Sequence, residues 1–320
     1  MKKIMRGVCL MGVLALLATS CNKNKETVTS IKTYNQQMEV VAGEFEDGQK
    51  VQLNPSDNRL YFEDGDLLTL FKIAENPVNS ACADFYPTVG SQVDQTEWTP
   101  AGTTTLPDEG DLYAFCPGGT DYVRPDLVNE NRATFVIPAT QNYRENTCPK
   151  EGFFMASKSE DGETFYFKNI CGLLWLKLYS ASNRTVKSIK VTDRGGKHLA
   201  GDVSLKIDKV NPETLTSLYR NYNPNSDSYM STLAAYIRES GYSVTNLSET
   251  MTLDCGNGVQ IGTKSAQATN FYLTMRPLAL REGFDIEVEC TDGYIFNFGT
   301  AKSNIVGPNI VKKMPALDIR

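Results

Sequence analysis

Apolar and polar residues alternate with a period of two along much of this chain. The clearest examples are residues 203–208, 251–255 and 286–290, in which every second side chain is apolar. Because successive side chains of a strand point to opposite faces, each segment predicts a strand with one buried and one wet face. Turn sequences rich in Gly, Asp, Asn or Pro separate the segments, at 63–66, 117–119, 193–196, 257–258 and 292–293. Many short strands with turns between them predict antiparallel β-sandwiches.

Two stretches depart from this alternation. Residues 165–179 hold the most apolar run outside the N-terminus and predict a strand that is buried on both faces and opens a second domain. The acidic turn just before this run sets the division, which gives a first sandwich over 31–158 and a second over 159–320. Residues 211–248 lose the alternation and predict an insertion, with a short helix over 231–240 closed by Gly241.

The N-terminus carries the features of a secretory signal. Three basic residues, Lys2, Lys3 and Arg6, precede an apolar run over 8–18, which is shorter than the about 20 residues that a membrane span needs. Residues 17–21 (Leu-Ala-Thr-Ser-Cys) resemble the lipobox of bacterial lipoproteins. We expect a signal peptide over 1–20, acylation of Cys21, a tether over 21–30 and attachment to the outer membrane through acyl chains. The alternative is an ordinary cleaved signal in which the cysteine is incidental.

Charge and size limit the classes of function. Removing Lys2, Lys3 and Arg6 from 32 basic residues leaves 29 against 38 acidic residues, a formal net charge of −9. This balance argues against nucleic acid as a partner. The mature length of about 300 residues is enough for two domains of ordinary size.

Six cysteines beyond Cys21 are open to two interpretations. An exported chain meets an oxidising compartment, so pairs such as Cys116 with Cys171 or Cys255 with Cys290 are plausible disulfides. Several of these cysteines are in phase with buried apolar residues, which fits free thiols in the core equally well. The six are Cys82, Cys116, Cys148, Cys171, Cys255 and Cys290.

Few residues suggest catalysis or metal binding. The one histidine, His198, follows the turn at 193–196, and no nucleophile or carboxylate can be assigned to it, so a turn or surface role is expected. Glu63, Asp64 and Asp66 crowd three carboxylates around Gly65, but their spacing does not fit a calcium loop and favours a turn. We therefore expect no enzyme activity, no cofactor and no metal.

Aromatic residues suggest a second hypothesis, glycan binding, because exposed aromatic rings bind sugars. Trp175 lies in the apolar run and is expected in the core. Trp98 stands in a polar, threonine-rich stretch and is the exposed candidate, together with tyrosines of the insertion. Candidate ligand contacts are therefore Trp98, Tyr222, Tyr229 and Tyr236.

Several motifs, taken in order, resemble the fimbrillin-like family, the lipoprotein subunits of type V pili on gram-negative anaerobes. The first is an aromatic-acidic-Gly-Asp turn over 60–66 that leads into an apolar strand over 67–71. The others are spread over nearly the whole mature chain, at 112–117, 137–141, 154–156, 165–169, 199–201, 271–277 and 309–311.

This resemblance implies two tandem transthyretin-like antiparallel β-sandwiches with no catalytic role. It also implies a structural subunit of a cell-surface fimbrium that contributes to adhesion and joins other fimbrial subunits by donor-strand exchange. In such exchange an open sheet edge receives a strand from a neighbouring subunit. Host or bacterial surface ligands are possible further partners.

The position of the first arginine departs from the family pattern. Arg59 is the first arginine after Cys21, and only lysines precede it, the last being Lys50. Arg59 and Lys50 are the candidate protease maturation sites, and cleavage at Arg59 would remove more than the usual leader, including strands expected over 38–41 and 51–53. We therefore expect an accessory subunit, at the tip or the membrane anchor, and keep a lipid-anchored surface glycan-binding protein as the alternative.

Overall fold

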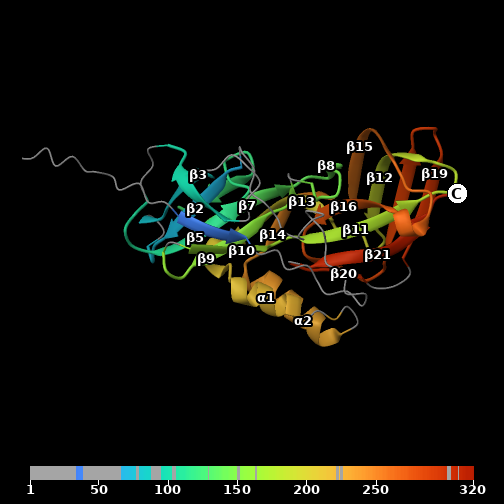
Figure 1. Cartoon of the computed structure of the whole chain (residues 1–320). Helices are drawn as coiled ribbons and strands as arrows, with labels where there is room; N and C mark the ends of the chain where they lie inside the picture. Colours follow the sequence, from blue (N-terminus) through green and yellow to red (C-terminus); the bar gives the residue numbers. More distant parts are fainter. Residues whose placement is uncertain are drawn as a thin grey trace, which may run out of the picture. The chain divides into compact units, whose positions relative to one another are not determined.

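Strands dominate the fold, as the period-two pattern predicts. The computed structural model describes residues 34–38, 66–76, 79–87, 95–102, 106–128, 130–149, 152–162, 164–220, 223, 226–300, 304–308 and 310–320. The first strands are β1 (Tyr34–Met38), β2 (Leu68–Ile73), β3 (Ala81–Pro87), β4 (Gln95–Pro100), β5 (Asp111–Cys116), β6 (Val123–Asp126), β7 (Arg132–Ile137), β8 (Thr140–Asn142), β9 (Met155–Ser159) and β10 (Thr164–Asn169). They are shown from blue to green in Figure 1.

The remaining strands follow from residue 172 onward, with two helices among them. The strands are β11 (Gly172–Tyr179), β12 (Thr185–Asp193), β13 (Ala200–Lys206), β14 (Ser243–Ser248), β15 (Thr250–Gln260), β16 (Thr269–Met275), β17 (Leu278–Leu280), β18 (Phe284–Cys290), β19 (Ile295–Gly299), β20 (Asn304–Val306) and β21 (Val311–Asp318). The helices are α1 (Pro212–Arg220) and α2 (Asp227–Glu239). The described chain is thus an all-β, sandwich-like fold with a helical insertion, and its strand pairs are mainly antiparallel.

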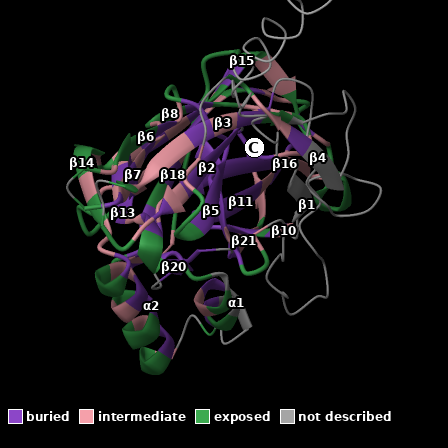
Figure 2. Ribbon diagram, turned by 90° about the vertical axis from the view of Figure 1, so that its left-hand side faces the viewer, coloured by how far each residue is buried: buried purple, intermediate pink, exposed green. Residues whose placement is uncertain are grey.

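Seven strands form a closed barrel in the order β1-β10-β9-β5-β2-β3-β4. Its interior is filled by one cluster that includes Leu70, Trp98 and Phe165. The opposite faces of β2 and β5 belong to a second, larger cluster, where Phe71 and Phe115 meet edge to face at 5.3 Å between ring centroids. Burial on both faces explains why these strands are continuous apolar runs rather than alternating ones, and Figure 2 shows them in purple.

Three larger sheets carry much of the rest of the large cluster, and the two-stranded sheet β17-β20 and the helices add to it. The orders of the three larger sheets are β19-β18-β12-β15-β8, β16-β11-β21 and β14-β13-β7-β6. The alternating residues of β15 and β18 point inward as predicted, with Leu253 and Val288 fully buried. Each strand therefore places one apolar face on the core and one polar face in solvent.

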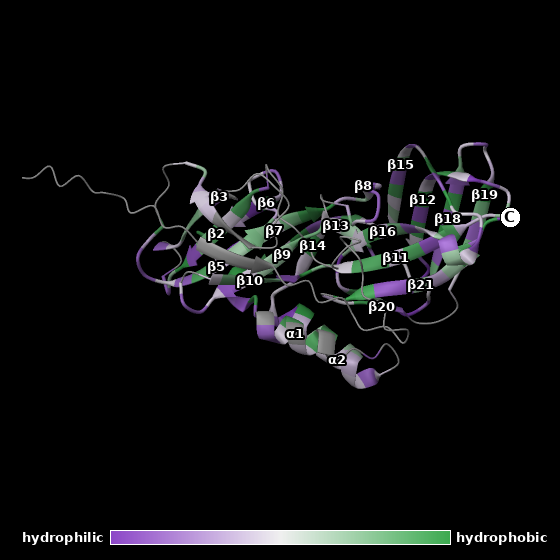
Figure 3. Cartoon of the chain, in the orientation of Figure 1, coloured by the Kyte–Doolittle hydropathy of each residue, from purple (hydrophilic) through white to green (hydrophobic). Residues whose placement is uncertain are grey.

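The apolar run over 165–179 forms two strands rather than the single strand that the sequence predicts. The backbone N–H of Cys171 donates to the Asn169 side chain (2.8 Å), a local turn that ends β10 before β11 begins. At Gly172 a Cβ would lie 2.2 Å from Val306, so the close approach of β20 requires glycine there. The expected burial of β11 on both faces is confirmed, and Figure 3 colours most of this strand as hydrophobic.

Strand pairing crosses the predicted division at residue 158. β10 lies beyond it and yet belongs to the barrel, while β7 pairs with β13 and β8 pairs with β15. The chain from Thr33 to Arg320 forms one compact unit. The division into two sandwiches therefore stays a prediction.

The insertion over 211–248 packs on the core through its helices. The expected helix over 231–240 is confirmed and starts earlier, because Ser226 caps α2 by accepting from the Tyr229 N–H. Gly241 ends it with a φ of +61°. The two helices pack against each other (Figure 1) and bury Leu215, Leu218 and Leu233 in the large cluster. The end of the insertion returns to the sheet as β14.

A buried glutamine joins motifs that are far apart in the sequence. Gln141, in the 137–141 motif, is fully buried, and its side-chain amide donates to the Thr274 carbonyl (2.6 Å). Its side-chain oxygen accepts from the Thr274 N–H (2.9 Å). The side chain thus takes the place of a neighbouring strand at the edge of β16, within the 271–277 motif.

Gln141→Ala tests this contact. The substitution leaves a buried N–H and C=O of β16 without partners, each costing about 1–3 kcal/mol, so we expect the free energy of unfolding to fall by about 2–4 kcal/mol. Urea denaturation of both proteins measures the change. Gln260→Ala is the matched control, because that exposed amide bonds only the Asn183 side chain and should change stability by less than about 0.5 kcal/mol. Equal effects of the two substitutions would contradict the assigned role.

Candidate functional site

The strand β1 closes the barrel. Its residues 35–38 pair in parallel with residues 164–167 of β10, and residues 34–37 pair antiparallel with residues 95–98 of β4. β10 and β4 make no pairing with each other, so β1 alone connects these two edges. Without β1 the barrel would open between them and expose unpaired N–H and C=O groups on both sides.

The walls beside β1 are apolar and fully buried. On β10, Phe165 and Phe167 point into the barrel while Tyr166, between them, is 49% exposed. On β4, Trp98 points into the same interior. Large buried side chains on both neighbours and two backbone edges make the β1 position a site for an extended strand.

The sequence signals the walls of this site but not the strand itself. The alternation of Phe165, Tyr166 and Phe167 is visible in the sequence and lies in one of the family-like motifs. β1 has the polar sequence Tyr-Asn-Gln-Gln-Met, which no strand pattern indicates. The strand predicted over 38–41 overlaps β1 only at Met38, and residues 39–41, like the strand predicted over 51–53, lie outside the described part of the chain.

The aromatic residues expected to contact ligands are buried instead. Trp98 is 0% exposed inside the barrel, because β4 turns that side chain inward despite its polar neighbours. Tyr229 and Tyr236 are 3% and 5% exposed, because they form the face of α2 that packs on the core. The interpretation of these three rings as surface contacts is therefore wrong. Tyr222 lies outside the described residues.

The processing residues fall in the part of the chain that the structure does not describe. Cys21, Lys50 and Arg59 all lie there, as do Glu63 and Asp64 of the acidic turn. Asp66, the last residue of that turn, is described and is 9% exposed. Acylation at Cys21 and cleavage at Lys50 or Arg59 stay predictions.

All six described cysteines are free thiols, and five of them are buried. Cys255 on β15 and Cys290 on β18 flank β12 on opposite sides, so two strand spacings of about 4.8 Å separate them. This exceeds the about 7 Å that a disulfide can span between Cα atoms. Cys116 belongs to the barrel interior and Cys171 to the other cluster. The thiol interpretation is therefore the one that the structure supports.

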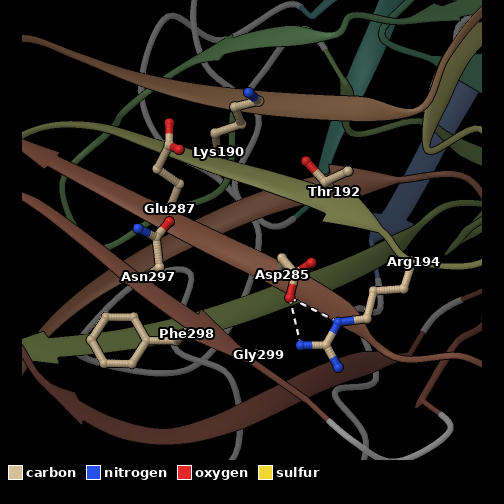
Figure 4. Close-up of a pocket in the computed structure, with 8 residues that line it drawn as sticks. All are labelled: Lys190, Thr192, Arg194, Asp285, Glu287, Asn297, Phe298 and Gly299. Atoms are coloured by element: carbon tan, nitrogen blue, oxygen red, sulfur yellow. Dashed lines mark hydrogen bonds and ion pairs between the residues drawn. The ribbon is translucent and has the colours of Figure 1, made fainter.

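A shallow polar hollow lies on the outer face of the five-stranded sheet (Figure 4). Its volume is about 550 Å³, and it is lined by residues of β12, β18 and β19. Arg194 lies at one end and donates two hydrogen bonds to Asp285, at 2.8 and 2.5 Å. Lys190 and Glu287 line it as a cross-strand pair of opposite charge.

These polar groups belong to a charge pattern that runs along two strands. β12 and the residues that flank it carry basic side chains, and β18 carries acidic ones opposite them. Lys187 donates to Glu289 at 2.7 Å, and this bond lowers the pKa of the Glu289 carboxyl. Exposed pairs of this kind contribute little stability, but opposite charges favour this register of β12 on β18. The hollow offers hydrogen-bond donors and acceptors beside one aromatic residue, Phe298.

The described residues hold no group of three or more His, Cys, Asp or Glu side chains that is suited to a metal ion. His198 is half-buried after the Asp193 turn, and its carbonyl accepts from Arg276 Nε at 2.5 Å. No described helix has both the length and the apolar character of a membrane span.

No family model and no curated protein matches the sequence. Among solved structures, the chain is similar to a candidate cell adhesion protein from Bacteroides ovatus (14% identity, TM-score 0.45, covering 87% of this chain and 89% of that one). A candidate cell adhesion protein from Bacteroides uniformis gives 12% identity and a TM-score of 0.46, covering 83% and 94%. The tip fimbrial protein Mfa3 from Porphyromonas gingivalis gives 8% and 0.34, covering 90% and 96%. All three likenesses are distant.

Burial is expected to slow the reaction of three described thiols with alkylating reagents. It raises the pKa of Cys148, Cys171 and Cys255 to about 12. At pH 8 their thiolate fraction is then about 10⁻⁴, against about one quarter for a free cysteine with a pKa of about 8.5. We expect alkylation of these three at pH 8 to be at least about 100-fold slower in the folded protein than in concentrated guanidinium chloride, and to speed up as the pH rises toward 11. Mass spectrometry after iodoacetamide treatment measures this. Equal rates in both states would refute it.

Proposed function

We propose that this protein is a non-catalytic structural subunit of a cell-surface fimbrium. In this proposal it is an accessory subunit at the tip or the anchor, brought to the outer membrane by acyl chains on Cys21 and then joined to neighbouring subunits by β-strand exchange. The lipobox-like segment and the ordered motifs support the class of protein. The position of β1 supports the mode of assembly.

The β1 position is the observation that carries the proposal. One short strand from the N-terminal end of the chain fills a gap between two edges of an otherwise continuous barrel. Such a strand is bound largely through backbone pairing, which a strand from another chain can supply equally well. Large apolar walls such as Phe167 would give an incoming strand pockets for alternate side chains.

Both proposed cleavage residues lie between β1 and β2 in the sequence. Lys50 and Arg59 both follow β1, which ends at Met38, and precede β2, which begins at Leu68. A cut at either residue leaves β1 held in the barrel by non-covalent contacts alone. A neighbouring strand can then replace it, and the link to the lipid on Cys21 is lost at the same time.

Deletion of the gene tests the fimbrial role. We expect fimbriae that differ from the parent strain in number or length, together with weaker adhesion, and we expect the intact gene to restore both. Electron microscopy and an adhesion assay measure these properties. Fimbriae and adhesion identical to the parent in all three respects would contradict the proposal.

The N-terminus of the assembled protein tests strand exchange. We expect the protein in purified fimbriae to begin after Lys50 or Arg59, and we expect Arg59→Lys to remove an arginine-specific cut while keeping the charge. The uncut variant would keep Cys21 and β1 on one chain and enter fimbriae poorly. Lys50→Arg is the matched control, because it adds an arginine between β1 and β2 without changing the charge. Assembled protein that begins only at acylated Cys21 would rule out exchange at this site and leave a membrane-anchor role.

A further inference from the structure

The only Asn-Gly dipeptide in the sequence, Asn257-Gly258, lies within a strand. The sequence pattern predicts a turn at this dipeptide, but β15 continues through it. The register of β15 on β12 jumps from Asp254 to Val259, so residues 255–258 have no regular partner on β12 and form a bulge. The bulge therefore holds the Asn-Gly dipeptide where the regular pairing of the strand is interrupted.

The fold requires a glycine at position 258. Gly258 has a φ of +103°, a conformation that residues with a side chain rarely adopt. A Cβ at this position would lie 2.6 Å from the Thr185 side chain and 2.8 Å from the Thr291 side chain. The packing of the sheet therefore excludes a larger residue directly after Asn257.

The side chain of Asn257 is exposed and makes no hydrogen bond within the described part of the chain. The two other Asn-Gly or Asp-Gly dipeptides among the described residues differ in this respect, because their carboxylates are held. Asp161 accepts from the Thr164 N–H (2.7 Å), and Asp292 accepts from Arg184. Asn257 is thus the one of the three whose side chain is free to turn toward the backbone.

We propose that Asn257 undergoes spontaneous deamidation in the folded protein. The backbone nitrogen of Gly258 loses its proton and attacks Cγ of Asn257, which closes a succinimide ring. The bond from Cγ to the side-chain nitrogen breaks, and that nitrogen leaves as ammonia with the proton. Water then opens the ring at either of its two carbonyls and leaves aspartate or isoaspartate at position 257. Water is the only co-reactant.

The local structure favours this attack. Gly258 has no Cβ to shield its nitrogen, and Gly256 on the other side also has a positive φ (+57°) and lies in open space. Asp161 and Asp292 would first have to break the hydrogen bonds that hold them. A segment without regular cross-strand partners also changes conformation more readily than a fully paired strand.

Deamidation changes this end of the five-stranded sheet in two ways. Both products add a negative charge to the bulge, which lies opposite Lys187 of β12. Isoaspartate also lengthens the main chain by one methylene group just before Val259, which pairs with Val186. We expect the isoaspartate product to weaken this pairing and the adjacent hydrogen bond from Gln260 to the Asn183 side chain (2.7 Å). This inference does not depend on the proposed fimbrial function.

Ageing of the full-length, detergent-solubilised protein tests the proposal. In mildly alkaline buffer we expect a more acidic species to accumulate, at a rate proportional to the hydroxide concentration, because the attacking nitrogen must lose its proton. Digestion at acidic pH and mass spectrometry should place the exchange of NH2 for OH in the peptide that contains residue 257, as two separable products. Asn257→Gln should remove the acidic species, because glutamine would have to close a larger ring.

Asn246→Gln is the matched control. Asn246 is also exposed and has a positive φ (50°), but its side-chain amide donates to Asp202 (3.0 Å) and the bulkier Leu247 follows it. This variant should form the acidic species at the rate of the parent protein. Circular dichroism confirms that both variants are folded.

Three outcomes would overturn the proposal. One is a folded protein whose residue 257 stays unchanged while the same peptide converts in concentrated guanidinium chloride, since the fold would then protect Asn257. Another is an acidic species that forms equally fast in Asn257→Gln. The third is conversion of the other exposed asparagines at the same rate as Asn257.

Discussion

Unpaired backbone at strand edges is the constraint on which the rest of this structure depends. A strand edge leaves N–H and C=O groups that must find partners in the chain, in water or in another strand. The barrel meets this constraint with β1, and the edge of β16 meets it with the side chain of Gln141. The two solutions differ in one respect that matters for function. Gln141 is an integral part of the core, whereas β1 is joined to the barrel through a segment that contains Lys50 and Arg59.

The Gln141 contact and β1 therefore have different roles. The Gln141 contact stabilises the fold, and β1 is the strand that the proposed assembly would exchange. The Gln141 contact links the 137–141 and 271–277 motifs, so its loss weakens the fold itself. β1 lies between β10 and β4, whose side chains, including Trp98 and Phe165, are buried in the barrel interior. In the proposed strand exchange, these side chains would contact the incoming strand.

Much of the fold could be predicted from the sequence because period-two alternation reports directly on strand faces. The inward side of β15 and β18, the burial of β11 and the α2 helix with its Gly241 end follow from local patterns. The break after Asn169 could not be predicted, because it depends on one side-chain hydrogen bond and on the approach of Val306 to Gly172. The burial of Trp98 was also beyond local reasoning, since its neighbours are polar and only the barrel closure turns the ring inward. β1 was missed for a similar reason: its polar sequence carries no strand signal, and its partners β4 and β10 lie about 60 and 130 residues further along the chain.

The positions of the cysteines and the aromatic residues make the strand edges the features of most interest for function. The described thiols are free and nearly all buried, and the rings expected at the surface pack in the core, so neither set is presented to a ligand. The outer face of the five-stranded sheet is polar, with opposite charges arranged to favour one register of β12 on β18. At the edge of this sheet, β19 leaves backbone N–H and C=O groups without a partner among the described strands. Its sequence carries no charge and no proline. Strand edges are therefore the described features that present unpaired hydrogen-bonding groups, and the proposed assembly by strand exchange would use such an edge.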